Sequence, residues 1–175
     1  EPNVKSYYWH LGLLLLLQGQ EVEAQTTWLL GMTEGEPEEI ELWTQELIEI
    51  LQTEAERRKD LGDHSIAWAI RQHIREINPV DINNLLHLIG LSTVLGTYTG
   101  EQLTELGAIE LLQSDTPINV DDDLLMQVLN NVLELALLDP LSYDLTEACI
   151  AHIKNSELFR QLSIQFASRM GYSAK

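Results

Sequence analysis

The sequence predicts an all-α protein built from antiparallel helical hairpins, and three observations lead to this fold class. Glycine and proline are sparse and fall between stretches in which apolar residues recur at helical spacing. Alternating Val, Ile, Thr and Tyr residues, which would indicate β-strands, are almost absent. The stretch "IELWTQELIEILQTEAE" shows the helical spacing most clearly, because it places apolar residues on one face and acidic residues on the other.

The same spacing predicts about nine helices joined by short turns. Thr99 and Ser142 are predicted N-caps, because their hydroxyls can accept from the free backbone N–H groups of a first turn. Helix ends are expected at Asn78-Pro79 and Asp139-Pro140, since the residue before proline is pushed out of the α region. The predicted ranges are 4–18, 20–32, 37–59, 62–77, 80–95, 100–113, 119–138, 142–153 and 155–170.

The first helix contains five consecutive leucines, Leu13 to Leu17, within "WHLGLLLLLQGQ". A membrane span needs about 20 apolar residues, and this run ends at Gln18. A signal peptide would need a basic leading region, and only Lys5 precedes the run. We therefore predict a buried helix. Because successive residues turn by about 100°, the leucines cover most of its circumference. We therefore expect this helix to have neighbours on both sides in the parent protein, or to self-associate through the N-terminal hairpin.

Length and charge narrow the class of protein further. The 175 residues suit a single domain over 1–175, and the chain begins at Glu1 without a methionine, so we expect it to be part of a longer protein. The net charge of −18 disfavours nucleic acid and anionic membranes as partners and favours a basic protein partner. Cys149 is the only cysteine, so no internal disulfide can form, which fits a reducing, cytoplasmic compartment.

In the first predicted hairpin, large, small and aromatic residues stand at fixed offsets, at Tyr8, Leu11, Gly12, Leu15, Gly19, Ala24, Trp28 and Gly31. This pattern resembles a tetratricopeptide (TPR) repeat. Gly12 lets the second helix approach the first, and Trp28 fills the space between hairpins. The later repeats are irregular, because the intervals between Pro37, Pro79 and Pro140 exceed the standard period. The expectation is a TPR-like, right-handed array.

Two longer stretches add a family resemblance. "SYYWHLGLLLLLQGQEVEAQTTWLLGMTEGEPEEIELWTQELIEILQTEAER" and "AWAIRQHIREINPVDINNLLHLIGLS" resemble the N-terminal TPR-like region of large cyanobacterial proteins. These are SPINDLY-type O-linked N-acetylglucosamine transferases or FkbM-type methyltransferases. The resemblance implies a non-catalytic interaction or scaffolding module that precedes a glycosyltransferase or a methyltransferase domain. Its partner would be another protein or the catalytic domain of its own parent.

The partner-binding groove of such an array would be lined by the first helix of each hairpin, so His10 and Leu13 are the candidate groove residues. Animal O-linked N-acetylglucosamine transferases carry groove asparagines two residues before the Leu-Gly glycine. His10 and Leu88 occupy that position here, so no asparagine ladder for peptide backbone is predicted.

Two other classes of function remain open. Cys149 and His152 lie three residues apart in a predicted helix, so a small helical enzyme could use a thiolate–imidazole pair, although a buried structural cysteine is favoured. A cofactor-binding bundle is the third class, and one cysteine argues against covalent pigment attachment. No catalytic residue, metal ligand or cofactor is predicted. The histidines at 64, 73 and 87 are interpreted as surface or capped side chains, and Asp121–Asp123 as the acidic first turn of a helix.

Overall fold

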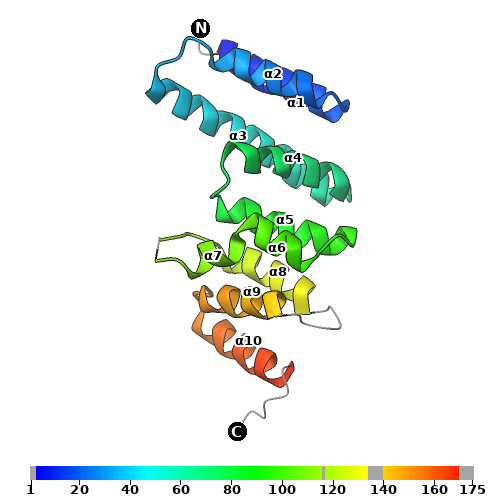
Figure 1. Cartoon of the computed structure of the whole chain (residues 1–175), viewed down its shortest axis with the longest axis vertical. Helices are drawn as coiled ribbons and strands as arrows, with labels where there is room; N and C mark the ends of the chain where they lie inside the picture. Colours follow the sequence, from blue (N-terminus) through cyan, green and yellow to red (C-terminus); the bar gives the residue numbers. More distant parts are fainter. Residues whose placement is uncertain (1–2, 116, 134–139, 170–175) are drawn as a thin grey trace. The chain divides into compact units, whose positions relative to one another are not determined.

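The computed structural model describes residues 3–115, 117–133 and 140–169. The predicted fold class is confirmed, because these residues form ten helices and no strand. They are α1 (Asn3–Leu17), α2 (Glu21–Met32), α3 (Pro37–Asp60), α4 (His64–Ile77), α5 (Ile82–Leu95), α6 (Gly100–Leu106), α7 (Ala108–Gln113), α8 (Asp122–Leu133), α9 (Pro140–Ala151) and α10 (Ser156–Arg169) (Figure 1). None of these helices combines the length and the apolarity that a membrane span requires.

The chain divides into two compact units, Glu1–Pro79 and Val80–Lys175. The boundary coincides with the predicted helix end at Asn78-Pro79. That end is confirmed, since Asn78 caps α4 with φ −138° and ψ 87°. The first unit, unit 1, contains α1 to α4, and the second, unit 2, contains α5 to α10.

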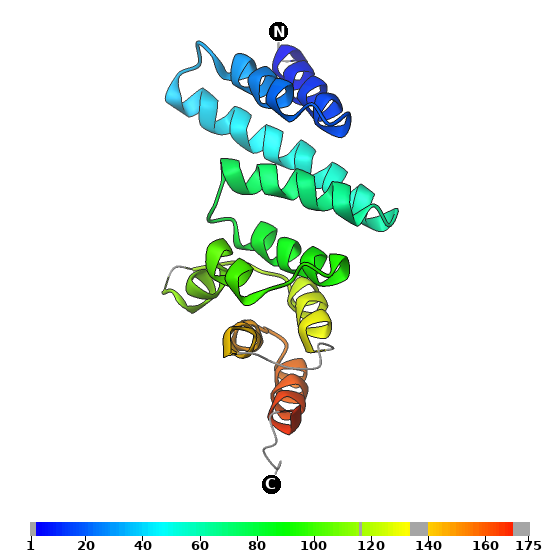
Figure 2. The same cartoon turned by 45° about the vertical axis from the view of Figure 1, so that its right-hand side comes forward.

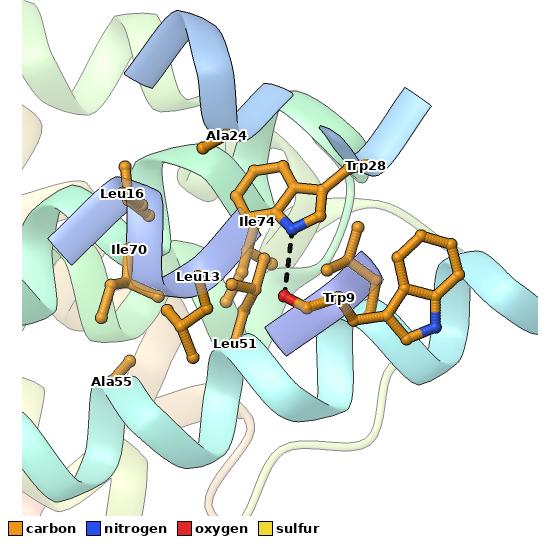
Figure 3. Close-up of a cluster of buried hydrophobic side chains, with 10 residues drawn as sticks. Trp9, Leu13, Leu16, Ala24, Trp28, Leu51, Ala55, Ile70 and Ile74 are labelled. Atoms are coloured by element: carbon orange, nitrogen blue, oxygen red, sulfur yellow. Dashed lines mark hydrogen bonds between the residues drawn. The ribbon is translucent and has the colours of Figure 1, made fainter. Parts of the chain in front are cut away.

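Unit 1 consists of two antiparallel hairpins, α1 with α2 and α3 with α4 (Figure 1). In the first hairpin the indole of Trp28 lies against Gly12 and donates a hydrogen bond from Nε1 to the carbonyl oxygen of Trp9 (3.2 Å), as Figure 3 shows. Gly31 lies against the ring of Trp9. The predicted close approach of the two helices at Gly12 is therefore present.

The two hairpins of unit 1 have the same orientation. Along α1 and α3, the ammonium of Lys5 lies 4.4 Å from the centre of the Trp43 ring, and Leu13 and Ile50 line the same cleft further along both helices. The first helices of the two hairpins therefore run parallel. Along α2 and α4, Glu21 contacts His73 and Gln25 contacts Glu76, so the second helices also run parallel. Their shared core contains Trp9, Leu13, Leu16, Ala24, Trp28, Leu47, Leu51, Ala55, Ile70 and Ile74 (Figure 3).

The leucine run is covered on only part of its circumference. Leu13 and Leu16 are buried in the core of unit 1, whereas Leu14 is 57% exposed. Neighbours on both sides of this helix were expected in the parent protein or from a second copy, so this expectation stays a prediction. The uncovered apolar surface belongs to the first hairpin.

Unit 2 is held together by α5 and α9. Helix α5 packs on α7 and α8, and α9 packs on α6, α7, α8 and α10 (Figure 2). Most of α5 is buried, and its buried residues are Ile82, Asn84, Leu85, Leu86, Leu88, Ile89, Leu91 and Ser92. The predicted N-cap Thr99 is confirmed, because its Oγ1 accepts from the backbone N–H of Gln102 (3.1 Å). Asp122 and Asp123 lie in the first turn of α8, as predicted, and Asp121 precedes them.

Two predictions in unit 2 are wrong. The helix expected at 100–113 is two helices, because Gly107 adopts φ +71° and this left-handed conformation ends α6. Ser142 is not an N-cap: α9 begins at Pro140, whose fixed φ suits a first helical position, and Ser142 is buried within the helix. Its hydroxyl shares a hydrogen bond with Tyr98 Oη (2.6 Å). Residues 134–138 of the helix predicted at 119–138, and Asp139 of the predicted end, lie outside the described residues.

Candidate protein-binding site

The two predicted groove residues lie together in a cleft between α1 and α3. This α1–α3 cleft has a volume of about 340 Å³ and is lined by His10, Leu13, Glu49, Ile50, Thr53 and Glu54. Leu13 is buried and Ile50 is half-buried, so they form an apolar floor. His10, Glu49 and Thr53 are exposed and form a polar rim around it.

The amphipathic pattern of α3 explains which of its residues form the floor of the cleft and which form its rim. Ile50 belongs to the apolar face of α3, while Glu49 and Thr53 lie beside that face and remain exposed. Pro37 begins this helix, and Glu36 caps it: the backbone N–H of Glu36 donates to Oε1 of Glu39 (3.3 Å), and the Glu36 side chain accepts in return from the backbone N–H of Glu39. A long, well-capped helix therefore carries the acidic side of the cleft.

The two carboxylates of the cleft, Glu49 and Glu54, differ in whether a basic side chain neutralises their charge. Glu54 accepts hydrogen bonds from Arg57 and Arg58, and the bond from Arg57 contributes most to lowering the pKa of Glu54 below its ordinary value. Its charge is therefore largely compensated within α3. Glu49 is exposed and forms no ion pair with another described residue. A bound cation would thus meet Glu49 first.

A second cleft lies on another side of α3, against α2 and α4. It has a volume of about 260 Å³ and an apolar lining that includes Trp28, Leu29 and Met32. Its polar edge is a cluster around His73. His73 is buried, so of the two interpretations, a surface or a capped side chain, the surface one is wrong for this residue. The cluster joins His73 to Glu21, Gln25 and Glu76.

The geometry of the cluster indicates a structural role for His73. Its Nε2 lies 3.4 Å from Oε1 of Glu21, and its Nδ1 lies 3.5 Å from Nε2 of Gln25. Both contacts are hydrogen bonds if Nε2–H donates to the carboxylate of Glu21 and Nδ1 accepts from the amide of Gln25. The amide of Gln25 also donates to Oε2 of Glu76 (3.1 Å). These hydrogen bonds connect α2 to α4. Among the described residues, no group of three or more His, Cys, Asp or Glu side chains could hold a metal ion.

Cys149 and His152 are not arranged as a reactive pair. Cys149 is fully buried in α9, and His152 lies just beyond the last residue of that helix. The His152 ring donates from Nε2 to the carbonyl oxygen of Leu112 (2.6 Å). Burial raises the pKa of the Cys149 thiol to about 12, so the thiolate required of a nucleophile is disfavoured at neutral pH.

We predict that Cys149 is unreactive in the native chain. At about pH 8, an aromatic disulfide reagent should modify the thiol only after denaturant is added. The pKa of this thiol is about 12 in the folded chain and 9.0 when the thiol is exposed. The unfolded chain therefore loses the proton first, and the free energy of unfolding should fall as the pH rises from about 9 to about 12. Rapid modification of the folded chain, followed by absorbance, would contradict this burial.

The sequence pattern found part of the α1–α3 cleft and missed the rest. The TPR offsets singled out His10 and Leu13, and the amphipathic pattern of α3 had placed Ile50 on an apolar face. Nothing local connected Glu49 or Thr53 with His10, because the two sides of the cleft are about 40 residues apart in sequence. The comparison of the chain with protein-family models, curated proteins and solved structures gives no match.

Proposed function

We propose that the chain is a non-catalytic protein-interaction module with TPR-like, right-handed stacking of its hairpins. The supporting observation is the repeated orientation in unit 1, where α1 and α3 run parallel side by side and α2 and α4 do the same. Stacked hairpins of this kind bring their first helices to one face, which is the face that helical arrays use for extended binding surfaces. The α1–α3 cleft lies between these first helices.

The partner in this proposal is a basic amphipathic segment of another protein. The floor of Leu13 and Ile50 can take an apolar side chain, and the exposed Glu49 can pair with a Lys or Arg beside it. Further exposed carboxylates continue along α3, and the chain carries a net charge of −18, so an acidic segment would be repelled. The exposed carboxylates of α3 before Glu49 are Glu38, Glu39, Glu41 and Glu46.

The test uses synthetic amphipathic peptides that differ only in the charge of their polar face. We expect the full chain to bind the basic peptide with a dissociation constant on the order of 10 µM, and more weakly as salt is raised. Glu49→Lys should weaken this binding about tenfold, because it replaces an attraction by a repulsion. Fluorescence anisotropy of a labelled peptide would measure both effects.

The matched control is Asp144→Lys, which makes the same change in net charge at an exposed position of unit 2. It should leave the affinity for the basic peptide nearly unchanged. Equal losses in the two variants would mean that overall charge, rather than the α1–α3 cleft, attracts the peptide. Equal binding of the basic and the acidic peptide would remove the proposal altogether.

Self-association through the first hairpin is a further prediction. Leu14 on α1 and Leu30 on α2 are 57% and 55% exposed. Leu30→Glu should raise the dissociation constant of a dimer about tenfold, measured by sedimentation velocity, because it places a charge in an apolar contact. Leu61→Glu is the control, since Leu61 is similarly exposed (62%) but lies after α3. A wild-type chain that stays monomeric at high concentration would contradict the prediction.

The parent protein in this proposal is a SPINDLY-type O-linked N-acetylglucosamine transferase, or alternatively an FkbM-type methyltransferase, whose catalytic domain would be the nearest partner. The support is the sequence resemblance of the N-terminal stretches. The coding sequence downstream of Lys175 tests this directly, because a nucleotide-sugar domain and a methyl-donor domain have different sequence patterns. The enzyme alternative, with Cys149 and His152, requires that Cys149→Ser abolish turnover.

A further inference from the structure

Unit 2 contains a pocket between α9 and α10 that has a different character from the clefts of unit 1. Helix α9 contributes Tyr143, Glu147 and Ile150, and α10 contributes Phe159, Ser163 and Phe166. These residues recur at helical spacing on each helix, so one face of each helix forms one wall. The volume of about 330 Å³ is at the lower end of the range of small-molecule sites. Figures 1 and 2 both show α10 next to α9, on which it packs.

The pocket is rich in aromatic rings. The chain has only two phenylalanines, Phe159 and Phe166, and both line this pocket. The rings of Tyr143 and Phe166 are 5.0 Å apart between centroids and are tilted by 48°, so they form a corner rather than a flat stack. Phe159 is 42% exposed. An exposed phenylalanine beside such a corner leaves ring surface available to a ligand.

One carboxylate sets the charge of this pocket. Glu147 is exposed, and no basic side chain in the described part of the chain forms an ion pair with it. The faces of aromatic rings carry partial negative charge, which adds to that of the carboxylate. An anionic ligand such as a fatty acid is therefore disfavoured, whereas a cation with an apolar surface gains from both the rings and the carboxylate.

We propose that the pocket between α9 and α10 binds a small organic cation with a methylated ammonium group. The methyl groups contact the rings of Tyr143, Phe159 and Phe166, and the positive charge lies beside the carboxylate of Glu147. A methylated ammonium suits this site better than a bare ammonium, because its weaker hydration costs less to remove. This site is separate from the α1–α3 cleft and does not depend on the protein-binding function.

The test compares two probes of the same shape on the full chain. Choline carries the trimethylammonium group, and its neutral analogue has carbon in place of the nitrogen. We expect choline to bind with a dissociation constant on the order of 1 mM, since a small ligand has few atoms to bury, and the analogue to bind about tenfold more weakly. Chemical-shift changes of unit 2 amides in a titration report both. Equal binding of the two probes, or no binding of choline, would overturn the proposal.

Two variants locate the binding. Glu147→Gln and Phe159→Leu should each weaken choline binding about fivefold, through loss of the carboxylate and of one ring. Asp144→Asn is the matched control, because it removes an exposed carboxylate from the same helix outside the pocket. It should leave the affinity unchanged. If Asp144→Asn weakens binding as much as Glu147→Gln does, the cation is attracted by the net charge and the assignment of the pocket is wrong.

Discussion

Trp28→Ala is expected to lower the free energy of unfolding of unit 1 by about 3–5 kcal/mol, the cost of removing a large buried aromatic side chain. The indole of Trp28 is buried in the core of unit 1 (Figure 3). It occupies the space in which a Cβ at Gly12 would lie. It also donates a hydrogen bond to the carbonyl oxygen of Trp9. Its removal leaves a cavity where the hairpin meets the rest of the core.

Denaturation followed by two signals measures this loss. All four tryptophans, at positions 9, 28, 43 and 68, belong to unit 1, so tryptophan fluorescence reports on this unit while circular dichroism reports on the whole chain. Trp68→Ala is the matched control, because Trp68 is half-buried and should cost about 1–2 kcal/mol. A loss below about 1 kcal/mol for Trp28→Ala would contradict the packing described for the first hairpin.

The first hairpin could be predicted from the sequence because its contacts are local. Gly12 and Trp28 lie on consecutive helices, and the hydrogen bond from Trp28 to Trp9 spans only 19 residues of sequence. The offsets of a known repeat class specify such neighbours without information from the rest of the chain. The small residues at 12 and 31 then explain how two helices with large aromatic residues can approach so closely.

Unit 2 could be predicted less well, because its features depend on contacts between distant segments. The break at Gly107 was hidden by an apolar pattern that continues across it, and only the left-handed φ reveals two helices. Ser142 has the residue type of an N-cap, but burial against Tyr98 gives its hydroxyl a different partner, 44 residues away in sequence. Residue type alone does not distinguish these two uses of a serine hydroxyl.

The same limit applies to the candidate sites. His73 meets Glu21 across 52 residues, and the two walls of the α1–α3 cleft come from different hairpins. In contrast, the residues at each wall follow the helical period, so each wall was visible in the sequence as one face of a helix. The pairing of the faces was not, since it depends on how the hairpins stack.

Gly12→Ala is expected to destabilise unit 1 by about 2 kcal/mol, although alanine is the better helix former. A Cβ at position 12 would overlap the indole of Trp28, and this ring is buried and held by its hydrogen bond to Trp9. Overpacking costs about 1–3 kcal/mol, and the gain in helix propensity offsets up to about 1 kcal/mol. The net loss can be measured by denaturation followed by tryptophan fluorescence.

Gly90→Ala provides the matched comparison, because Gly90 also lies within a helix but has more space around it. The nearest atom that an added Cβ would meet there is Nδ2 of Asn131, at 3.8 Å. That distance is an ordinary contact, so this variant should stabilise unit 2 by about 0.5–1 kcal/mol.

In a Trp28→Ala background, Gly12→Ala should likewise become neutral or stabilising, since the ring that it would overlap is gone. The effects of Gly12→Ala and Trp28→Ala on the free energy of unfolding should therefore differ from additivity by about 3 kcal/mol. If the two effects add, the indole of Trp28 is not the reason that position 12 requires glycine.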